Sequence, residues 1–104
     1  MKRYRLKIDS EALTDIREIV EWYEGQQSGL GNRFRDTVID QIDYLKENPQ
    51  LFAIQYHQIR CMIVKKFPYM VHFYIDEQTE TVIILAVISS DRNPMIWKEK
   101  TKRR

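Results

Sequence analysis

The segment at residues 82–88 constrains the fold more than any other part of this chain, because all seven of its residues are apolar. Polar residues bound it on both sides, with Asp76-Glu77-Gln78 before it and Ser89-Ser90-Asp91 after it. A run of this length that is rich in β-branched residues is typical of a β-strand buried on both faces. The sequence therefore predicts a sheet that has residues 82–88 as its central strand.

The size and composition of the chain limit what else it can contain. A chain of 104 residues builds one domain around one hydrophobic core. Its single cysteine cannot form an internal disulfide, which suits a reducing cytoplasm, and we expect a cytoplasmic protein. The sequence has no apolar run near the ~20 residues that span a bilayer and no signal-peptide pattern, so we expect no membrane partner.

Opposite charges separate along the sequence. Residues 9–48 contain ten acidic and four basic residues, a net charge of −6, whereas the whole chain has a net charge of +2. The predicted strands and the C-terminal end therefore carry the positive charge, which favours a polyanionic partner or an acidic peptide on the sheet side. A solvated surface without a role in binding explains the asymmetry about as well.

Alternating and helical patterns fill the first half of the chain. Residues 3–8 alternate between apolar and cationic side chains, which predicts a half-buried strand. Asp9 and Ser10 supply N-cap oxygens for a helix that ends at Gly25, and a second helix runs from about residue 32 to residue 46. Because the link between the helices is short, they should lie antiparallel, with both apolar stripes on one face of the sheet. Trp22 falls just off the stripe, so it lies either at the edge of the core, which we favour, or in an exposed contact.

The second half of the chain predicts three strands at residues 59–67, 70–75 and 82–88. Their connections, Phe67-Pro68-Tyr69 and residues 76–80, are short, so the strands should form an antiparallel meander. The expected fold is α+β in the order β-α-α-β-β-β: an N-terminal strand and an antiparallel two-helix hairpin packed on one face of an antiparallel sheet. Residues 1–97 form the predicted domain, and residues 98–104 a basic C-terminal tail.

One face of this predicted sheet has no cover. Strand alternation places Met62, Val64, Met70 and Tyr74 on the face opposite the helices, together with half of residues 82–88. No remaining segment is long enough to cover them, and about 400 Å² of exposed apolar surface corresponds to roughly 10 kcal/mol. We therefore expect another molecule to bind this face.

An ordered set of short motifs resembles the RelE/ParE family of bacterial toxins from type II toxin-antitoxin systems. The motifs run almost from end to end of the chain: Trp22-Tyr23, Gly29-Leu30-Gly31 with Phe34, Asn48-Pro49, Arg60, Lys66-Phe67-Pro68-Tyr69, Tyr74, Ala86-Val87, Arg92-Asn93-Pro94 and Trp97. The resemblance implies a growth-inhibiting toxin of the kind that stabilises plasmids, and a cognate antitoxin that lays an extended or helical segment on it. The antitoxin would bind Met62, Val64, Met70 and Tyr74.

The resemblance leaves two cellular targets open. RelE-like members resemble ribosome-dependent messenger RNA endonucleases, which need a base, an acid and cations around the reacting phosphate. Several such nucleases carry His at the position after the last strand, where this sequence has Ser89. No Tyr follows Tyr74, so the C-terminal catalytic tyrosine of RelE has no counterpart. ParE-like members resemble inhibitors of DNA gyrase, and the sequence favours that group, with an inactive family member as a third alternative. A nuclease would use the following candidates: Arg60, Lys65, Lys66, His72, Tyr74 and Arg92. A gyrase inhibitor would bind its target through Arg60, Lys66, Arg92 and Trp97.

Several of these residues could have structural roles instead of functional ones. Arg60 and Arg92 could pair with Asp76, Asp91 or a helix C-terminus, and His72 is more often a satisfied sheet residue than a general base. Cys61 alternates with Ile59 and Ile63 and is best explained as a small core residue. His57 has no second ligand at metal spacing, so we expect no metal and no cofactor.

Overall fold

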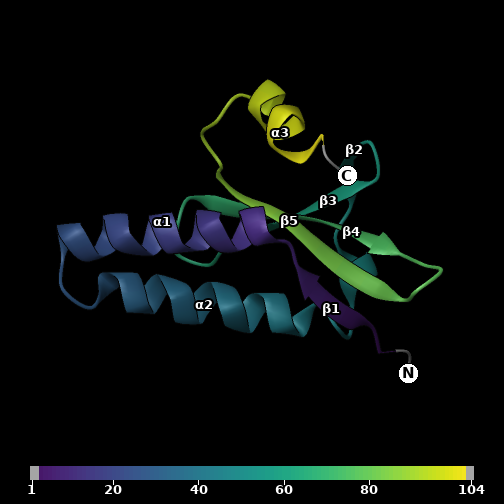
Figure 1. Ribbon diagram of the computed structural model, residues 1–104, viewed down its shortest axis with the longest axis horizontal. Helices are drawn as coiled ribbons and strands as arrows, with labels where there is room; N and C mark the ends of the chain where they lie inside the picture. The colour runs from purple at the N-terminus through teal and green to yellow at the C-terminus, as the bar shows by residue number, and fades with distance from the viewer. Residues whose placement is uncertain (1–2, 103–104) are drawn as a thin grey trace.

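The computed structural model describes residues 3–102, which form a five-stranded sheet with helices on both faces (Figure 1). The elements in chain order are β1 (Arg5–Ile8), α1 (Ser10–Gln26), α2 (Leu30–Tyr44), the 3-10 helix η1 (Pro49–Leu51), β2 (Ile54–Tyr56), β3 (Ile59–Ile63), β4 (Tyr69–Asp76), β5 (Thr81–Ser89) and α3 (Pro94–Thr101). Within residues 3–102, no helix has both the length and the apolar character needed to span a membrane.

The α+β architecture with a helical hairpin on one face is confirmed, but the sheet is mixed. Its strand order is β1-β5-β4-β3-β2, and β1 pairs with β5 in parallel whereas the other pairs are antiparallel. The antiparallel meander predicted for the last three strands is confirmed, and the parallel pairing of β1 is a feature that the sequence analysis did not predict. The meander leaves one edge of β5 free, and β1 fills that edge with Leu6 and Ile8 beside Val82 and Ile84. β5 is consequently an inner strand, whereas β4 is the central one.

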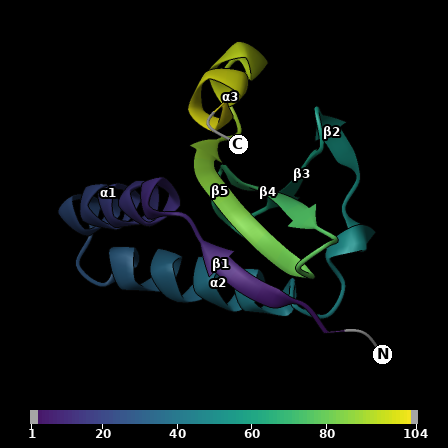
Figure 2. The same ribbon diagram turned by 45° about the vertical axis from the view of Figure 1, so that its right-hand side comes forward.

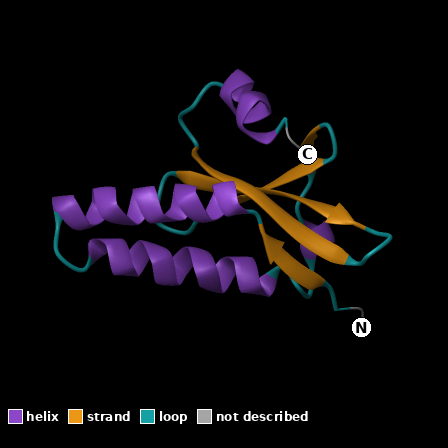
Figure 3. Ribbon diagram, in the orientation of Figure 1, coloured by secondary structure: helices purple, strands orange, loops and turns teal. Residues whose placement is uncertain are grey.

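The helical hairpin covers one face of the sheet as predicted (Figures 2 and 3). The Asp9 carboxylate accepts a hydrogen bond from Ser10 N at 2.9 Å and so caps α1. Apolar side chains of the two helices, Ala12, Ile16, Phe34, Val38 and Ile42, are fully or almost fully buried. They belong to one cluster with Val71 and Phe73 of β4 and Ile84 of β5, which are also fully buried. This cluster is the main hydrophobic core.

The opposite face is partly covered by α3, which the sequence analysis did not anticipate. Asn93 caps this helix by accepting a hydrogen bond from Met95 N at 2.8 Å, and Pro94 occupies its first turn. The Trp97 ring lies 5.2 Å from the His72 ring of β4, and Thr101 is only 2% exposed. Residues 98–101, assigned to a basic tail, are therefore helical, while Arg103 and Arg104 lie outside the described residues. The two-sided burial predicted for residues 82–88 is confirmed by Leu85, Ala86 and Ile88, which are as buried as the residues that face the hairpin.

The region around β2 and β3 also differs from expectation. Residues 54–56, predicted as a connection, form the edge strand β2, which pairs with Ile59 and Arg60 after a turn in which His57 has φ 52°. β3 ends at Ile63 instead of residue 67, and Lys66 has φ 67°, outside the extended region. The predicted long strand is therefore a short strand followed by a turn.

The predicted faces of Met62 and Val64 were wrong. Met62 pairs with Val71, and Met62 and Val64 are 3% and 1% exposed within the core under the helical hairpin. Met70 pairs with Ile63 on the opposite face, where alternation along β4 also places Tyr74. The four residues proposed to bind an antitoxin therefore do not share a surface. Alternation alone could not reveal this, because both faces of residues 59–67 contain apolar side chains.

Candidate target-binding site

Three segments that are distant in sequence meet at one end of the sheet. Ser90 N at the start of the β5–α3 loop donates a hydrogen bond to Pro68 O of the β3–β4 loop at 2.9 Å. The Tyr23 ring near the end of α1 lies 5.1 Å from the Phe67 ring and 6.2 Å from the Tyr69 ring. These contacts bring the end of α1 and both loops together around one surface.

A cleft of about 250 Å³ opens on this surface, and we call it the α1–β5 cleft. Its lining includes Glu18 and Trp22 from α1, Tyr69 from β4, Ser89 from β5, Arg92 from the following loop and Lys100 from α3. Side chains of both charges surround an apolar wall formed by Ile19, Val87 and Ile88.

Trp22 presents an aromatic surface in this cleft. Its side chain is 58% exposed, which agrees with the second alternative, an exposed contact, and not with the favoured position at the core edge. Its ring meets the Tyr23 ring edge-on at 5.1 Å. Exposed Trp, Tyr and Arg side chains that line a cavity are the residue types most often found at binding hot spots. The cleft therefore has the composition of a protein-binding site.

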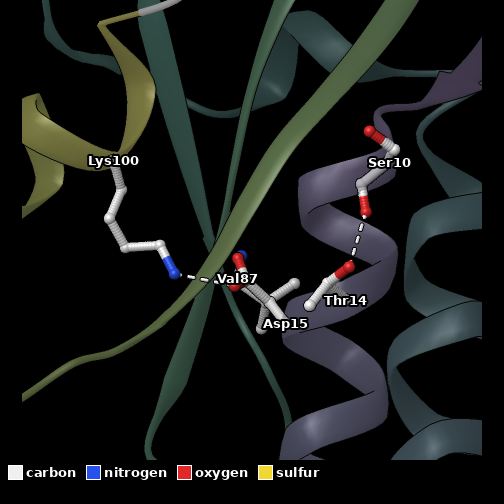
Figure 4. Close-up of polar contacts among 5 residues, drawn as sticks. All are labelled: Ser10, Thr14, Asp15, Val87 and Lys100. Atoms are coloured by element: carbon white, nitrogen blue, oxygen red, sulfur yellow. Dashed lines mark hydrogen bonds and ion pairs between the residues drawn. The ribbon is translucent and has the colours of Figure 1, made fainter.

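Asp15 and Lys100, which both line the cleft, form an ion pair that joins α1 to α3 (Figure 4). Lys100 Nζ lies 2.7 Å from Asp15 Oδ1, and Asp15 Oδ2 accepts a hydrogen bond from Val87 N at 3.0 Å. Arg92 is exposed and forms no ion pair with any side chain of residues 3–102. Since Lys100 is neutralised, Arg92 is the cation that the cleft can offer to a partner.

Arg60 is partly buried and hydrogen-bonds to the backbone around the end of η1. Its Nη1 donates hydrogen bonds to Phe52 O at 2.6 Å and to Gln50 O at 3.4 Å, so the guanidinium binds the carbonyls that follow η1. Lys65 and Lys66 are exposed in the β3–β4 loop. The structure thus leaves the loop lysines and Arg92 available at the surface.

His72 is sealed beneath α3. It is fully buried, with the Tyr56 hydroxyl 2.8 Å and Cys61 Sγ 3.4 Å from its Nδ1. Burial lowers the pKa of His72 to about 4, with a smaller effect from the nearby Lys100 charge, and burial also raises the pKa of Cys61 to about 12. Both side chains are therefore neutral near pH 7, and His72 cannot exchange protons with a ligand at the surface.

The candidate nuclease residues do not converge on one point. Arg60 faces the helical hairpin with its partner Phe73, whereas His72 and Tyr74 lie on the opposite face of β4. Arg92 lies in the loop after β5, beyond the end of the sheet. Acid–base cleavage needs its groups within hydrogen-bonding reach of one reacting phosphate, and this arrangement does not provide that.

Trp97, which the sequence analysis proposed as a target contact, is partly buried and packs on the sheet. Its ring lies 6.0 Å from the Tyr56 ring and 5.2 Å from the His72 ring. Its Nε1 is buried and has no hydrogen-bond partner among residues 3–102. Trp97 therefore anchors α3 to the sheet.

The sequence analysis missed Asp15 and Lys100, and it favoured a core-edge position for Trp22 over the exposed one observed. An acidic residue inside the apolar stripe of α1, between Ala12 and Ile16, was the available signal for Asp15. No sequence signal identified Lys100, because its role depends on a helix that resembled a tail.

Residues 3–102 contain no group of three or more His, Cys, Asp or Glu side chains that could hold a metal ion.

Comparison with known proteins places these features in a family. A family model described as the ParE toxin of type II toxin-antitoxin system, parDE, matches residues 6–94. A search of curated proteins finds no significant match.

Solved structures of toxins share the fold at low sequence identity. A chain from the chromosomal ParDE toxin-antitoxin system of P. aeruginosa is 15% identical, with a TM-score of 0.75 over 84% of this chain and 96% of that one. A mutant of E. coli toxin RelE in the free state is 17% identical, with a TM-score of 0.72 over 97% of each chain. A chain of the intact E. coli RelBE toxin-antitoxin complex is 16% identical, with a TM-score of 0.64 over 86% of this chain and 99% of that one.

Proposed function

This chain belongs to the ParE toxin family of type II toxin-antitoxin systems, and from that premise we propose that it inhibits DNA gyrase in the cytoplasm without cleaving RNA. The inhibition would be relieved by a cognate antitoxin. The observation that carries the non-enzymatic part of this proposal is the burial of His72. The fully buried imidazole has a pKa near 4, so His72 has a packing role and is not accessible to an RNA substrate as a general base or acid.

The α1–β5 cleft is the surface that supports a target-binding role best. Trp22 provides exposed apolar area, and Arg92, which forms no ion pair within residues 3–102, provides a cation for the anionic groups of a protein–DNA complex. Lys66 extends the positive surface through the β3–β4 loop, which is hydrogen-bonded to the β5–α3 loop. Of the target-binding residues proposed from sequence, Lys66 and Arg92 are retained, and Trp22 replaces Trp97.

An antitoxin partner is supported by the family and by the relatives. The RelBE structure from E. coli and the RelBE2 structure from Mycobacterium tuberculosis are toxin-antitoxin complexes. We propose that this chain likewise binds its own antitoxin. The structural similarity to RelE also keeps the alternative of a messenger RNA endonuclease open. That similarity concerns the fold alone.

Expression in cells without antitoxin tests the proposal. The native chain should cause filamentation and DNA breaks while messenger RNA stays intact. Arg92→Ala and Trp22→Ala should relieve growth arrest, because each removes a group that the cleft offers to the target. Both side chains are exposed, so the free energy of unfolding should change by less than about 0.5 kcal/mol.

Arg17→Ala is the matched control, since Arg17 is an exposed cation of α1 that does not line the cleft. It should arrest growth as the native chain does. Full toxicity of both cleft variants would contradict the assignment of the target-binding surface. Codon-phased cleavage of messenger RNA on ribosomes would contradict the proposed function itself.

A further inference from the structure

The short C-terminal helix α3 is held to the sheet by contacts that converge on one buried histidine. α3 has eight residues, and helices of that length are only marginally stable in water without tertiary contacts. It lies on the face of the sheet opposite the helical hairpin (Figures 1 and 2). Its Trp97 ring packs 5.2 Å from the His72 ring of β4, and its Thr101 Oγ1 lies 3.2 Å from the Tyr56 hydroxyl of β2. The docking of α3 therefore depends on the state of these side chains.

Hydrogen bonds between these side chains assign the proton of the neutral His72 ring. The Thr101 hydroxyl donates to Trp97 O at 2.8 Å, so Thr101 Oγ1 accepts the proton of the Tyr56 hydroxyl. The single proton of Tyr56 is then in use, and its oxygen accepts a hydrogen bond from His72 Nδ1 at 2.8 Å. The neutral ring therefore carries its proton on Nδ1 and leaves Nε2 unprotonated.

The surroundings of His72 do not favour a second proton on the ring. That proton would add to Nε2, whose one hydrogen-bonding contact in the described part of the chain is Cys61 Sγ at 4.0 Å. The residue opposite His72 on β5 is the apolar Ala86. The titratable and charged groups that face the ring come from four elements: Tyr56 of β2, Cys61 of β3, Tyr74 of β4 and Lys100 of α3. This set contains no carboxylate, and its one cation repels an imidazolium.

Release of α3 would remove this cost. Burial lowers the pKa of His72 to about 4, with a smaller effect from the Lys100 charge. When α3 leaves, the ring meets water and Lys100 is withdrawn, so the pKa should return towards its ordinary value of 6.5. Between these values the released form binds more protons than the docked form. The ratio of released to docked α3 should therefore rise up to about tenfold for each unit that the pH falls.

From this cluster we propose that a proton added to His72 Nε2 releases α3 from the sheet while the rest of the domain stays folded. Release separates Lys100 from Asp15, and both residues line the α1–β5 cleft. Acidification should therefore change the cleft and weaken the binding of a target there. This last consequence rests on the proposed function, whereas the release of α3 does not.

Hydrogen exchange of the full chain, followed by NMR, tests the release directly. Protection factors correct for the effect of pH on intrinsic exchange, and those of the α3 amides should fall roughly twentyfold between pH 7 and pH 5. At pH 5 they should also be at least about tenfold lower than those of β4 and β5, because a local opening requires less free energy than global unfolding. Equal protection of α3 and the two strands at pH 5 would overturn the inference, since α3 would then open only with the whole domain.

Substitution of the two histidines of the chain identifies the group that titrates. Glutamine does not titrate, so in His72→Gln the protection of α3 should change less than about twofold between pH 7 and pH 5. His57→Gln is the matched control, because His57 is exposed and lines a cleft with Lys98 and Glu99 of α3. It should keep the native twentyfold fall. A fall that persists in His72→Gln and disappears in His57→Gln would overturn the inference.

The native chain itself provides a measurement that does not depend on any variant. NMR of the ring nitrogens of His72 should show the proton on Nδ1 at pH 7, with Nε2 taking up its proton as α3 loses protection. A proton on Nε2 at pH 7 would overturn the inference. None of these measurements involves a target, so a negative result leaves the proposed function intact. A chain that releases α3 as described but does not inhibit gyrase at pH 7 would contradict the proposed function alone.

Discussion

Asp15 and Lys100 meet at 2.7 Å although 85 residues separate them in the sequence. Asp15 lies on α1, which covers one face of the sheet, and Lys100 lies on α3, which covers the other. The two side chains meet beside β5, at a point that the short strand β1 does not reach. Within residues 3–102, Val87 N has no neighbouring strand there and donates its hydrogen bond to Asp15. The Asp15 carboxylate thus accepts a hydrogen bond from the edge of β5 and also links the two helical layers.

Replacing Asp15 should therefore cost more than replacing Lys100. Asp15→Ala leaves the buried Val87 N–H without an acceptor and should lower the free energy of unfolding by about 2–4 kcal/mol. Lys100→Ala removes only the cation, whose side chain is 37% exposed, and should cost less than about 1.5 kcal/mol. Urea unfolding followed by circular dichroism measures both values. Equal losses would show that the ion pair, and not the hydrogen bond to Val87, is the main contribution.

His72 should make the stability depend on pH. Its pKa is about 4 in the folded protein and about 6.5 when unfolded, so the unfolded chain binds more protons between these values. Stability should be complete above about pH 6.5 and should fall by up to about 1.4 kcal/mol per pH unit as the pH drops towards 4.

His72→Gln should flatten this part of the pH profile, because glutamine does not titrate. The groups around His72 are Tyr56, Cys61 and Lys100, and Lys100 is paired with Asp15. His57→Gln is the matched control on an exposed histidine. A profile that stays equally steep in His72→Gln would assign the acid sensitivity to another group.

Two glycines near the helix junction should respond in opposite ways to alanine. A Cβ at Gly31 would overlap the Val20 carbonyl oxygen and lie 2.8 Å from Glu24 Oε1, so Gly31→Ala should force α1 and α2 apart and cost about 1–3 kcal/mol. A Cβ at Gly25 meets nothing within 4 Å, and Gly25→Ala should stabilise α1 by about 0.5–1 kcal/mol. Thermal unfolding of the two variants gives the comparison. Similar shifts in Tm would show that the helices can adjust their packing at Gly31.

Glu24 explains why this junction is short. Its carboxylate accepts hydrogen bonds from Gly29 N and Gly31 N, each at 2.8 Å, and these bonds, the one from Gly29 foremost, lower the pKa of Glu24. The carboxylate therefore binds the free amides at the start of α2. The sequence predicted a turn here from its glycines but not this acceptor, which comes from the preceding helix.

The parts of the fold that were predictable are those encoded by local patterns. The cap at Asp9, the antiparallel hairpin and the buried strand at residues 82–88 follow from capping chemistry and from the periods of helices and strands. The inner face of β3 was not predictable, because Met62 and Ile63 are both apolar and only the register with β4 turns Met62 inward.

The role of the last helix could not be predicted for a related reason. α3 is short and rich in lysine, so residues 98–101 had the composition of a solvated tail. Its stability comes from Trp97 and Thr101 packed on His72 and Tyr56, which are tertiary contacts. That packing also removed His72 and Trp97 from the candidate site and left Trp22 and Arg92 exposed around a cleft.

The most direct test of the central claim is a supercoiling assay with purified gyrase and the purified native chain. The account predicts that the chain inhibits supercoiling in a concentration-dependent way, that Arg92→Ala is a weaker inhibitor, and that His72→Gln inhibits as the native chain does. Supercoiling that proceeds unchanged at every concentration, together with messenger RNA cleavage on ribosomes that His72→Gln abolishes, would contradict it.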